Sequence, residues 1–253
     1  MAPVGTSAVL LRGYDYGDTS RILRFYTLEH GLLSVVARGV RGRSGKGGSV
    51  ANSFASGELV AYVKPHGDLH TMKDFTAQRS RSRIPLDILR FAGASCLAEL
   101  VLSHAEQEPH PYLFETLEDE LDRLDDSPVP ELPARVLSAL WRVTAAFGFA
   151  PELGGCVLCG RTLGDDELAR FDFEAGGVRC ESCGAGAVGP RVGPGARSQL
   201  LALLEGRPPE DFAHPRRHLA LVSDFMVHHV VSKPLKTLVF LADRLPADEG
   251  VIS

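Results

Sequence analysis

The chain of 253 residues contains no apolar run near the roughly 18 residues that a helix needs to cross a bilayer, which excludes an integral membrane protein of that kind. Its first residues lack the basic region of a secretory signal peptide, and Arg12 ends the first apolar run. The composition, with 44% hydrophobic and 23% charged residues, is that of a globular protein. We therefore expect a cytoplasmic protein of about one to three domains.

Sequence signatures of common enzymes are also missing. The chain has no Gly-x-Ser-x-Gly elbow, and its glycine-rich segment has no phosphate-binding loop with Gly-Lys-Ser/Thr. His214 and His218 are four residues apart, but no glutamate follows the first histidine as in a zinc protease. The acidic run of residues 118–122 is interpreted as a solvated helix face. We expect a protein that is not an enzyme.

Acidic residues are few in the first third of the chain, and they exceed basic residues in the rest. Residues 1–83 carry 12 Lys+Arg against 6 Asp+Glu, whereas residues 84–253 carry 15 against 26. A basic N-terminal third joined to an acidic remainder indicates that one module binds a polyanion and the other does not.

The sequence pattern of the N-terminal third predicts a small β-barrel. Short β-forming runs at residues 7–11, 22–27, 32–37, 58–64 and 69–78 are separated by turns, one of them at residues 14–18. Four to five such strands within about 80 residues, with a glycine-rich loop, favour a small closed β-barrel.

Basic residues follow the loop and strand ends of this barrel. The segment of residues 38–48 has five glycines and four cations and no hydrophobic period, which is typical of a mobile basic loop. Arg79 and Arg81 alternate at the end of the last strand, so they share one side if the strand continues. The predicted nucleic-acid-binding residues are Arg38, Arg41, Arg43, Lys46, Lys64, Lys73, Arg79 and Arg81. Rings on the same strands and turns belong to Tyr14, Tyr16, Phe25, Tyr26, Tyr62 and Phe75, and we expect at least half of them in the barrel core.

From Ile84 the hydrophobic period changes from 2 to 3.6, which predicts helices over residues 84–104, 112–124, 134–147, 197–204 and 219–231 and a final helical stripe over residues 235–245. Cys96 falls on an apolar helix face and is interpreted as a buried thiol. The predicted organisation is α+β and multidomain. It has a nucleic-acid-binding barrel at residues 1–82, a helical domain at 83–151 and 193–253, and a cysteine insert at 152–192.

The other four cysteines form two Cys-x-x-Cys pairs, Cys156 with Cys159 and Cys180 with Cys183. Two thiolates on a tight turn span one edge of a tetrahedron, and the glycine that follows each pair lets the chain reverse beneath a metal. A small hairpin between the pairs completes the layout of a zinc ribbon. Four thiolates leave no open position, so the spacing predicts a structural zinc. Unligated cysteines or redox pairs remain the alternative, although the redox pattern lacks a βαβ context.

Several of these segments resemble a known family. Residues 16–23 read Tyr-Gly-Asp-Thr-Ser-Arg-Ile-Leu, residues 25–31 contain Phe-x-Thr-x-Glu-His-Gly, and residues 36–41 read Val-Ala-Arg-Gly-Val-Arg. Together they resemble the N-terminal signature of the bacterial RecO family of DNA repair proteins. The Lys-Pro-Leu-Lys-Thr of residues 233–237 is similar to that family's C-terminal motif, except that Leu238 stands where the family commonly has Arg. The four-cysteine insert is similar to the zinc motif of many members.

The resemblance implies an N-terminal OB-fold, a helical domain and a structural zinc finger. It also implies a recombination mediator that binds single- and double-stranded DNA, anneals complementary strands and helps to load RecA onto gapped DNA covered by single-strand-binding protein. The implied partners are RecR, the acidic Phe-ending tail of single-strand-binding protein, possibly RecF and, indirectly, RecA. We expect a monomer that associates with the nucleoid during repair.

Two other interpretations stay open at this point. The chain could be a protein-interaction adaptor whose basic barrel binds an acidic partner rather than DNA, which would suit the acidic helical part. A zinc-dependent nucleic-acid enzyme would require an open metal position, against which four thiolates argue.

Overall fold

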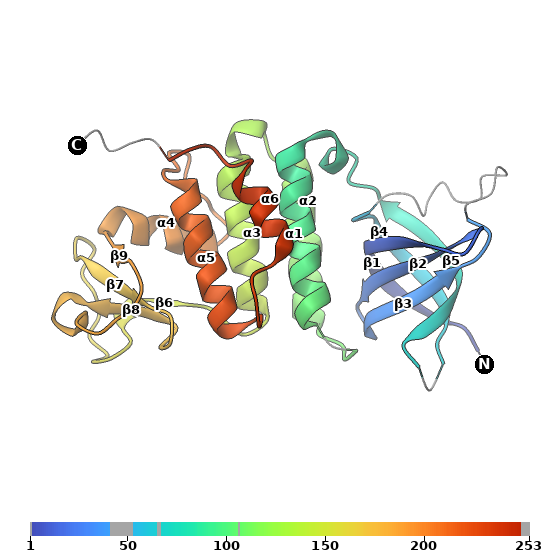
Figure 1. The fold of residues 1–253 in the computed structure, drawn as a ribbon, viewed down its shortest axis with the longest axis horizontal. Coiled ribbons are helices and arrows are strands. Elements are labelled where there is room, and N and C mark those ends of the chain that lie inside the picture. The colour runs from blue at the N-terminus through green and yellow to red at the C-terminus, as the bar shows by residue number, and fades with distance from the viewer. Residues whose placement is uncertain (1, 41–52, 65–66, 106, 249–253) are drawn as a thin grey trace. The chain divides into compact units, whose positions relative to one another are not determined.

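The computed structural model describes residues 2–40, 53–64, 67–105 and 107–248 (Figure 1). The chain forms two compact units, one made of Met1–Leu86 with Ala98–Asp125 and the other of Asp87–Leu97 with Asp126–Ser253. The first unit thus joins the N-terminal residues to a later helical segment, and the second unit contains the cysteine segment. None of the helices in the described ranges combines the length and apolar composition that a membrane crossing requires.

The first unit contains a closed barrel of five strands. They are β1 (Val4–Tyr16), β2 (Ser20–Thr27), β3 (Gly31–Ala37), β4 (Ser56–Tyr62) and β5 (Leu69–Arg79). The order around the barrel is β1-β2-β3-β5-β4, and β4 pairs again with β1. Only β3 and β5 are parallel among these pairs. This barrel confirms the predicted OB-type fold.

Alternating apolar residues form the barrel core. Leu10, Leu23, Phe25, Val35 and Phe75 are almost fully buried, and the Phe25 and Phe75 ring centroids are 4.9 Å apart. Burial of each such side chain contributes about 1.5–3 kcal/mol before the entropy of ordering is counted. The period of two in the sequence thus selects the face that points inward.

The first hairpin is longer than predicted. Residues 14–16 belong to β1 rather than to a turn, and the chain reverses at Gly17, whose φ of +60° suits glycine. Tyr14 pairs with Ile22, and Asp15 pairs with Arg21 across the two strands. Tyrosine favours strands and the Asp15–Arg21 ion pair of 3.5 Å supports the pairing, so the polar character of the segment was a misleading turn signal.

Helices α1 (Ile88–His104) and α2 (Pro111–Asp126) follow the barrel in the chain. Cys96 of α1 is fully buried, which confirms its prediction. In the first unit, α2 buries Leu113, Leu117, Leu121 and Leu124 at spacings of three and four.

The second unit is built around α3 (Leu132–Ala146), which packs against α4 (Pro194–Leu204) and α5 (Pro215–His229). A short helix, α6 (Lys236–Ala242), packs on α5. Trp141 of α3 is fully buried with its ring centroid 5.3 Å from that of Phe225 of α5. Large aromatic contacts of this kind anchor the helical core.

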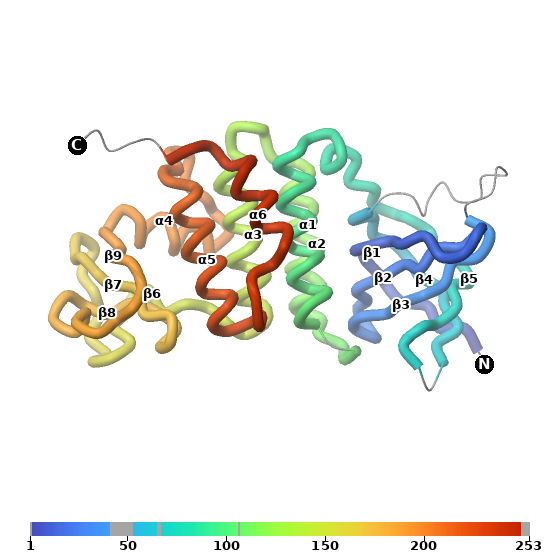
Figure 2. Tube along the Cα trace, in the orientation of Figure 1, coloured from blue at the N-terminus to red at the C-terminus, as the bar shows by residue number. Residues whose placement is uncertain are grey.

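A second small sheet carries the cysteines. Its strands are β6 (Glu152–Cys156), β7 (Ala169–Asp172), β8 (Gly177–Cys180) and β9 (Arg191–Val192), in the order β6-β8-β7-β9. The antiparallel pair β7–β8 confirms the predicted hairpin. Figure 2 shows this sheet beside α4 and α5.

Candidate metal centre and nucleic-acid interface

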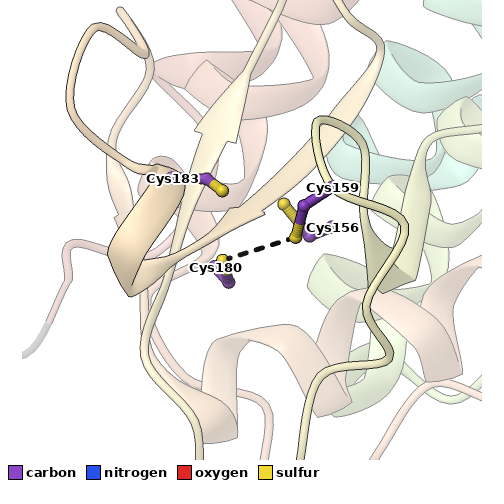
Figure 3. A group of neighbouring side chains, drawn as sticks. All are labelled: Cys156, Cys159, Cys180 and Cys183. Atoms are coloured by element: carbon purple, nitrogen blue, oxygen red, sulfur yellow. Dashed lines mark hydrogen bonds between the residues drawn. The ribbon is translucent and has the colours of Figure 1, made fainter.

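The four cysteines of the two pairs converge at one end of the small sheet. Cys156 ends β6 and Cys180 ends β8, and these two strands run parallel, so both pairs follow the same strand ends. The four Sγ atoms lie within 4.8 Å of one another, and those of Cys159 and Cys180 are 4.0 Å apart (Figure 3). Among the described residues, no other group of three or more His, Cys, Asp or Glu side chains brings its ligand atoms close enough to hold a metal ion.

The donor set fits a metal ion. A tetrahedral site with metal–sulfur bonds of about 2.3 Å has sulfur–sulfur edges of about 3.8 Å, close to the observed separations. A hydrogen bond from the Ser182 hydroxyl lowers the pKa of Cys180 to about 6. Hydrogen bonds that Cys183 donates to the Cys180 and Cys159 sulfurs stabilise its thiol and raise the pKa of Cys183 to about 12. Four thiolates therefore need a cation to coexist, and the cluster could hold a metal ion.

Glycine has the predicted role at one of the two turns. Gly160 has a φ of +72° and donates its backbone N–H to the Cys156 carbonyl at 2.8 Å, closing the first turn. Gly184 has a φ of −69° and stays in the right-handed region. The reversal that demands glycine thus occurs after Cys159 and not after Cys183.

The cysteine sheet shares its core with the helices. Phe171 of β7 is fully buried, and its ring meets the Phe225 ring of α5 edge-on at 6.0 Å. His229 of α5 hydrogen-bonds through Nε2 to the Phe173 carbonyl at 2.6 Å. The buried Arg197 of α4 donates to carbonyls in the loop before β7. The insert is therefore held by packing as well as by any metal, which composition alone did not predict.

Three of the predicted DNA-contacting residues lie exposed on the barrel unit. Arg38 follows β3, Lys64 follows β4, and Lys73 lies in β5. Within the described part of the chain, no carboxylate is within ion-pair distance of these three side chains. They are thus available to an anionic ligand. Arg41, Arg43 and Lys46 lie outside the described residues.

Arg81 is placed differently from the prediction. Strand β5 ends at Arg79, and Arg81 has a φ of +44°, so the expected alternation along a continuing strand is wrong. Only 2% of its side chain is exposed, and it forms ion pairs with Glu118 at 3.1 Å and Asp122 at 2.7 Å. It also donates to the Phe54 carbonyl at 2.6 Å. A guanidinium with these partners is not available to a phosphate, so we remove Arg81 from the proposed interface.

The acidic run of residues 118–122 is likewise more than a solvated face. Glu118 and Asp122 bind Arg81, and Glu120 is fully buried. Arg79 also forms an ion pair with Asp122, at 2.6 Å, but 59% of its side chain stays exposed. Arg79 therefore remains accessible, with part of its charge already compensated.

The aromatic residues of the barrel divide between core and surface. Phe25 and Phe75 lie in the barrel core, and Tyr26 is buried with its ring centroid 6.3 Å from that of Phe114 of α2. Tyr14 and Tyr16 are exposed on β1, and Tyr62 is half-buried. Half of the six rings thus reach the surface.

Two arginines of the barrel surface were missed by the sequence reasoning. Arg12 of β1 and Arg24 of β2 are directly opposite each other in the antiparallel pair. Arg24 alternates with the core residues Leu23 and Phe25, so the period of two identifies it as outward-facing. Arg12 has the same parity as the core residue Leu10, and it shares the face of Arg24 because the strand register shifts between Leu10 and Arg12. The sequence period alone therefore does not identify Arg12.

The second unit contains a largely apolar cavity of about 630 Å³. Its walls include Leu200 of α4, Leu221 of α5, Phe173 and the two arginines Arg191 and Arg217. His218 also lines it, hydrogen-bonded through Nε2 to Gln199 at 3.0 Å. Burial lowers the pKa of His218 to about 4, so this imidazole is neutral near pH 7.

A closed five-stranded OB-type barrel, helices and a small sheet with four converging thiols define a multidomain protein of mixed α and β structure. The family model described as the N terminal of recombination protein O matches residues 1–81, and the model of its C terminal matches residues 85–238. The chain belongs to this family, RecO. Membership implies a role in DNA repair and recombination.

Individual proteins agree with this assignment. A DNA repair protein RecO of Desulfatibacillum aliphaticivorans is 34% identical over 257 residues, which cover 96% of this chain and 98% of the relative. One of Myxococcus xanthus is 34% identical over 246 residues, covering 93% of this chain and 95% of the relative. One of Prosthecochloris aestuarii is 31% identical, with coverage of 91% and 93%.

Proposed function

We propose that this protein is a recombination mediator that binds single- and double-stranded DNA on its barrel, anneals complementary strands and helps to load RecA onto gapped DNA. The observation that carries the proposal is the set of exposed barrel cations, Arg38, Lys64 and Lys73, which lack carboxylate partners in the described residues. Family membership supplies the repair context. The protein would act in the cytoplasm, at the nucleoid.

Annealing follows from charge neutralisation on one surface. Two DNA strands repel each other through their phosphates, and each cation that pairs with a phosphate releases condensed counterions. A barrel that holds one strand and attracts a second lowers this repulsion, and the bases then pair without any bond being made or broken in the DNA. The proposed activity is therefore not enzymatic.

A salt series tests the contribution of the basic loop. Replacing Arg38, Arg41, Arg43 and Lys46 by glutamine should flatten the plot of log affinity for single-stranded DNA against log salt by nearly three units, since each phosphate contact contributes about 0.7. The measurement is fluorescence anisotropy with a labelled oligonucleotide across a salt series. An unchanged slope would remove the loop from the interface. No binding of the wild-type protein, even at low salt, would contradict the mediator mechanism and favour the adaptor interpretation.

We infer that the metal is zinc and that its role is structural. Bound zinc would join the ends of β6 and β8 through Cys156, Cys159, Cys180 and Cys183, and four thiolates leave it no position for a catalytic water. The chain itself contributes the orientation of the four side chains. Ser182 stabilises the Cys180 thiolate through its hydroxyl.

We further propose RecR, possibly RecF, and single-strand-binding protein as partners, with RecA acting downstream and the free protein a monomer. The apolar cavity of the second unit is suited to the acidic Phe-ending tail that the family resemblance implies. Leu200 and Leu221 would contact an aromatic ring, while Arg191 and Arg217 would attract its carboxylates.

Charge reversal at the two arginines tests this cavity as the binding site of the tail. Arg191→Glu with Arg217→Glu should weaken binding of a labelled acidic peptide ending in Phe by at least about tenfold, because like charges then face the peptide. Arg207→Glu is the matched control, since the Arg207 side chain is 77% exposed, forms its ion pair with Glu205 and does not line the cavity. Equal affinities for the reversed and wild-type proteins would place the tail elsewhere.

A further inference from the structure

The outer surface of the barrel carries side chains in two adjacent rows across the strands. One row contains Arg12, Arg24 and Ser34, which are cross-strand partners on β1, β2 and β3. The next row, two residues away on each strand, contains Tyr14, Ile22 and Val36. Core residues such as Leu23 and Val35 lie between the rows in sequence and point to the opposite face. The two rows together with Tyr16 form a surface that we call the β1–β3 outer face. Its residues are Arg12, Tyr14, Tyr16, Ile22, Arg24, Ser34 and Val36.

Aromatic side chains dominate the β1 edge of this face. Tyr14 is 42% exposed and Tyr16 is 51% exposed, although large apolar rings on strands are usually covered. The Arg12 guanidinium carbon lies 5.3 Å from the centroid of the Tyr14 ring, a cation–π contact that keeps the cation beside the ring. Ile22 and Val36 continue the apolar surface and are half-buried.

The two arginines of the first row face each other without a neutralising carboxylate among the described residues. Like charges directly opposite each other in an antiparallel pair are unfavourable, yet Arg12 and Arg24 occupy such positions. Throughout the described ranges, neither side chain has a carboxylate within ion-pair distance. The Nε atom of Arg24 is buried without a hydrogen-bond partner among the described residues. An anion bound between the two guanidinium groups would offset the repulsion between them.

We propose that the β1–β3 outer face binds single-stranded DNA in preference to duplex, with a phosphate between Arg12 and Arg24 and bases stacked on Tyr14 and Tyr16. The inference rests on the proposed DNA-binding function and adds its strand preference and its contact residues. The bases of a duplex already stack on each other, so only an unpaired strand offers their faces to protein rings. An intact duplex offers this face its phosphates alone.

The tyrosines are tested by comparing the two forms of DNA. Tyr14→Leu with Tyr16→Leu should weaken binding of a single-stranded 20-mer by at least about tenfold, since loss of one base–ring stack costs about fivefold or more. Affinity for the duplex of the same sequence should change less than about twofold. The salt slope should stay at its wild-type value, because no charge is removed. Tyr112→Leu is the matched control, as Tyr112 is 63% exposed on α2 and lies outside this face.

The arginines are tested by the salt slope. Arg12→Gln with Arg24→Gln should lower the slope for single-stranded DNA by about 1.4, or about 0.7 for each lost cation. Arg207→Gln, at an exposed site outside the barrel, should leave the slope unchanged. Circular dichroism and thermal unfolding identify any variant that fails to fold. Neither Arg12 nor Arg24 forms an ion pair within the described residues, so the substitutions break none there.

The outcomes separate this inference from the function on which it rests. A wild-type protein that binds single-stranded DNA while both double variants retain its affinity and slope overturns the inference and leaves DNA binding intact. An equal loss of single-stranded and duplex binding in the tyrosine variant overturns the strand preference. Absence of wild-type binding at low salt overturns the proposed function as well. A selective loss of single-stranded binding supports the inference.

Discussion

Cys180→Ser is expected to remove the metal from the protein and to lower its thermal stability more than any other single change described here. Cys180 is fully buried at the end of β8, and serine cannot supply the soft thiolate that completes the set. Metal binding in zinc-finger peptides is worth about 10–16 kcal/mol, so loss of one ligand removes a large share of the local stability. Metal content should fall from about one zinc per chain to near zero in elemental analysis.

The helical core should survive this substitution in part. Phe171 packs against Phe225, and Arg197 holds the loop before β7, independently of the metal. We therefore expect the melting temperature to fall without complete loss of helical circular dichroism. Cys96→Ala is the matched control, because Cys96 is buried in α1 and lies outside the cluster. A Cys180→Ser protein that keeps one tightly bound zinc would contradict the assignment of the ligands.

Arg81→Ala is expected to destabilise the first unit by about 3 kcal/mol. The substitution removes the buried cation beside Glu118, which is only 16% exposed and keeps only a longer ion pair of 3.5 Å with the exposed Arg79. It also removes a donor from the Phe54 carbonyl. Removing one partner of a buried ion pair typically costs about 3–5 kcal/mol, and the 34% exposure of Asp122 moderates that cost. Urea unfolding measures the change.

Arg79→Ala provides the matched comparison. Arg79 pairs with the same two carboxylates, but 59% of its side chain is exposed, so its removal should cost only about 0–1 kcal/mol. The two variants should also differ in DNA binding, since Arg79 stays accessible whereas Arg81 is buried. Equal stability losses for the two variants would show that burial of Arg81 has no energetic consequence. A steep loss of salt slope in a folded Arg81→Ala protein would restore Arg81 to the DNA interface.

The strands and helices were largely predictable because their signals are local. A period of two placed Leu23, Phe25 and Val35 on one face of a hairpin, and that face is the barrel core. Helical spacing likewise placed Leu117, Leu121 and Leu124 on the buried side of α2. The end of the first hairpin was misplaced, because polar residues such as Asp15 occur both in turns and on the outer face of strands.

The cysteine cluster was also predictable. The spacing of Cys156 and Cys159, repeated at Cys180 and Cys183, encodes two turns whose thiols can meet, and the four sulfurs do meet. The identity of the metal stays a proposal. The hairpin between the pairs was visible in the sequence for the same local reason, since β-formers lie on both sides of a glycine turn.

Charge, in contrast, was not a sufficient guide to function. Arg79 and Arg81 look equivalent in the sequence, yet one is exposed and the other is buried among carboxylates of α2, about 40 residues later in the chain. Arg12 and Arg24 look unremarkable one at a time, and their significance arises from the strand register that sets them opposite each other.

The sequence by itself determined most of the alternation of the strands, the faces of the helices and the four thiols that can hold a metal ion. Each depends on residues that are neighbours in the chain or on a repeated spacing, so local geometry suffices to specify it. Only the tertiary structure decided which of the described cations lack carboxylate partners and which rings stay exposed. Those properties depend on partners distant in sequence, because the burial of a side chain and the neutralisation of its charge are set by whatever the fold packs against it.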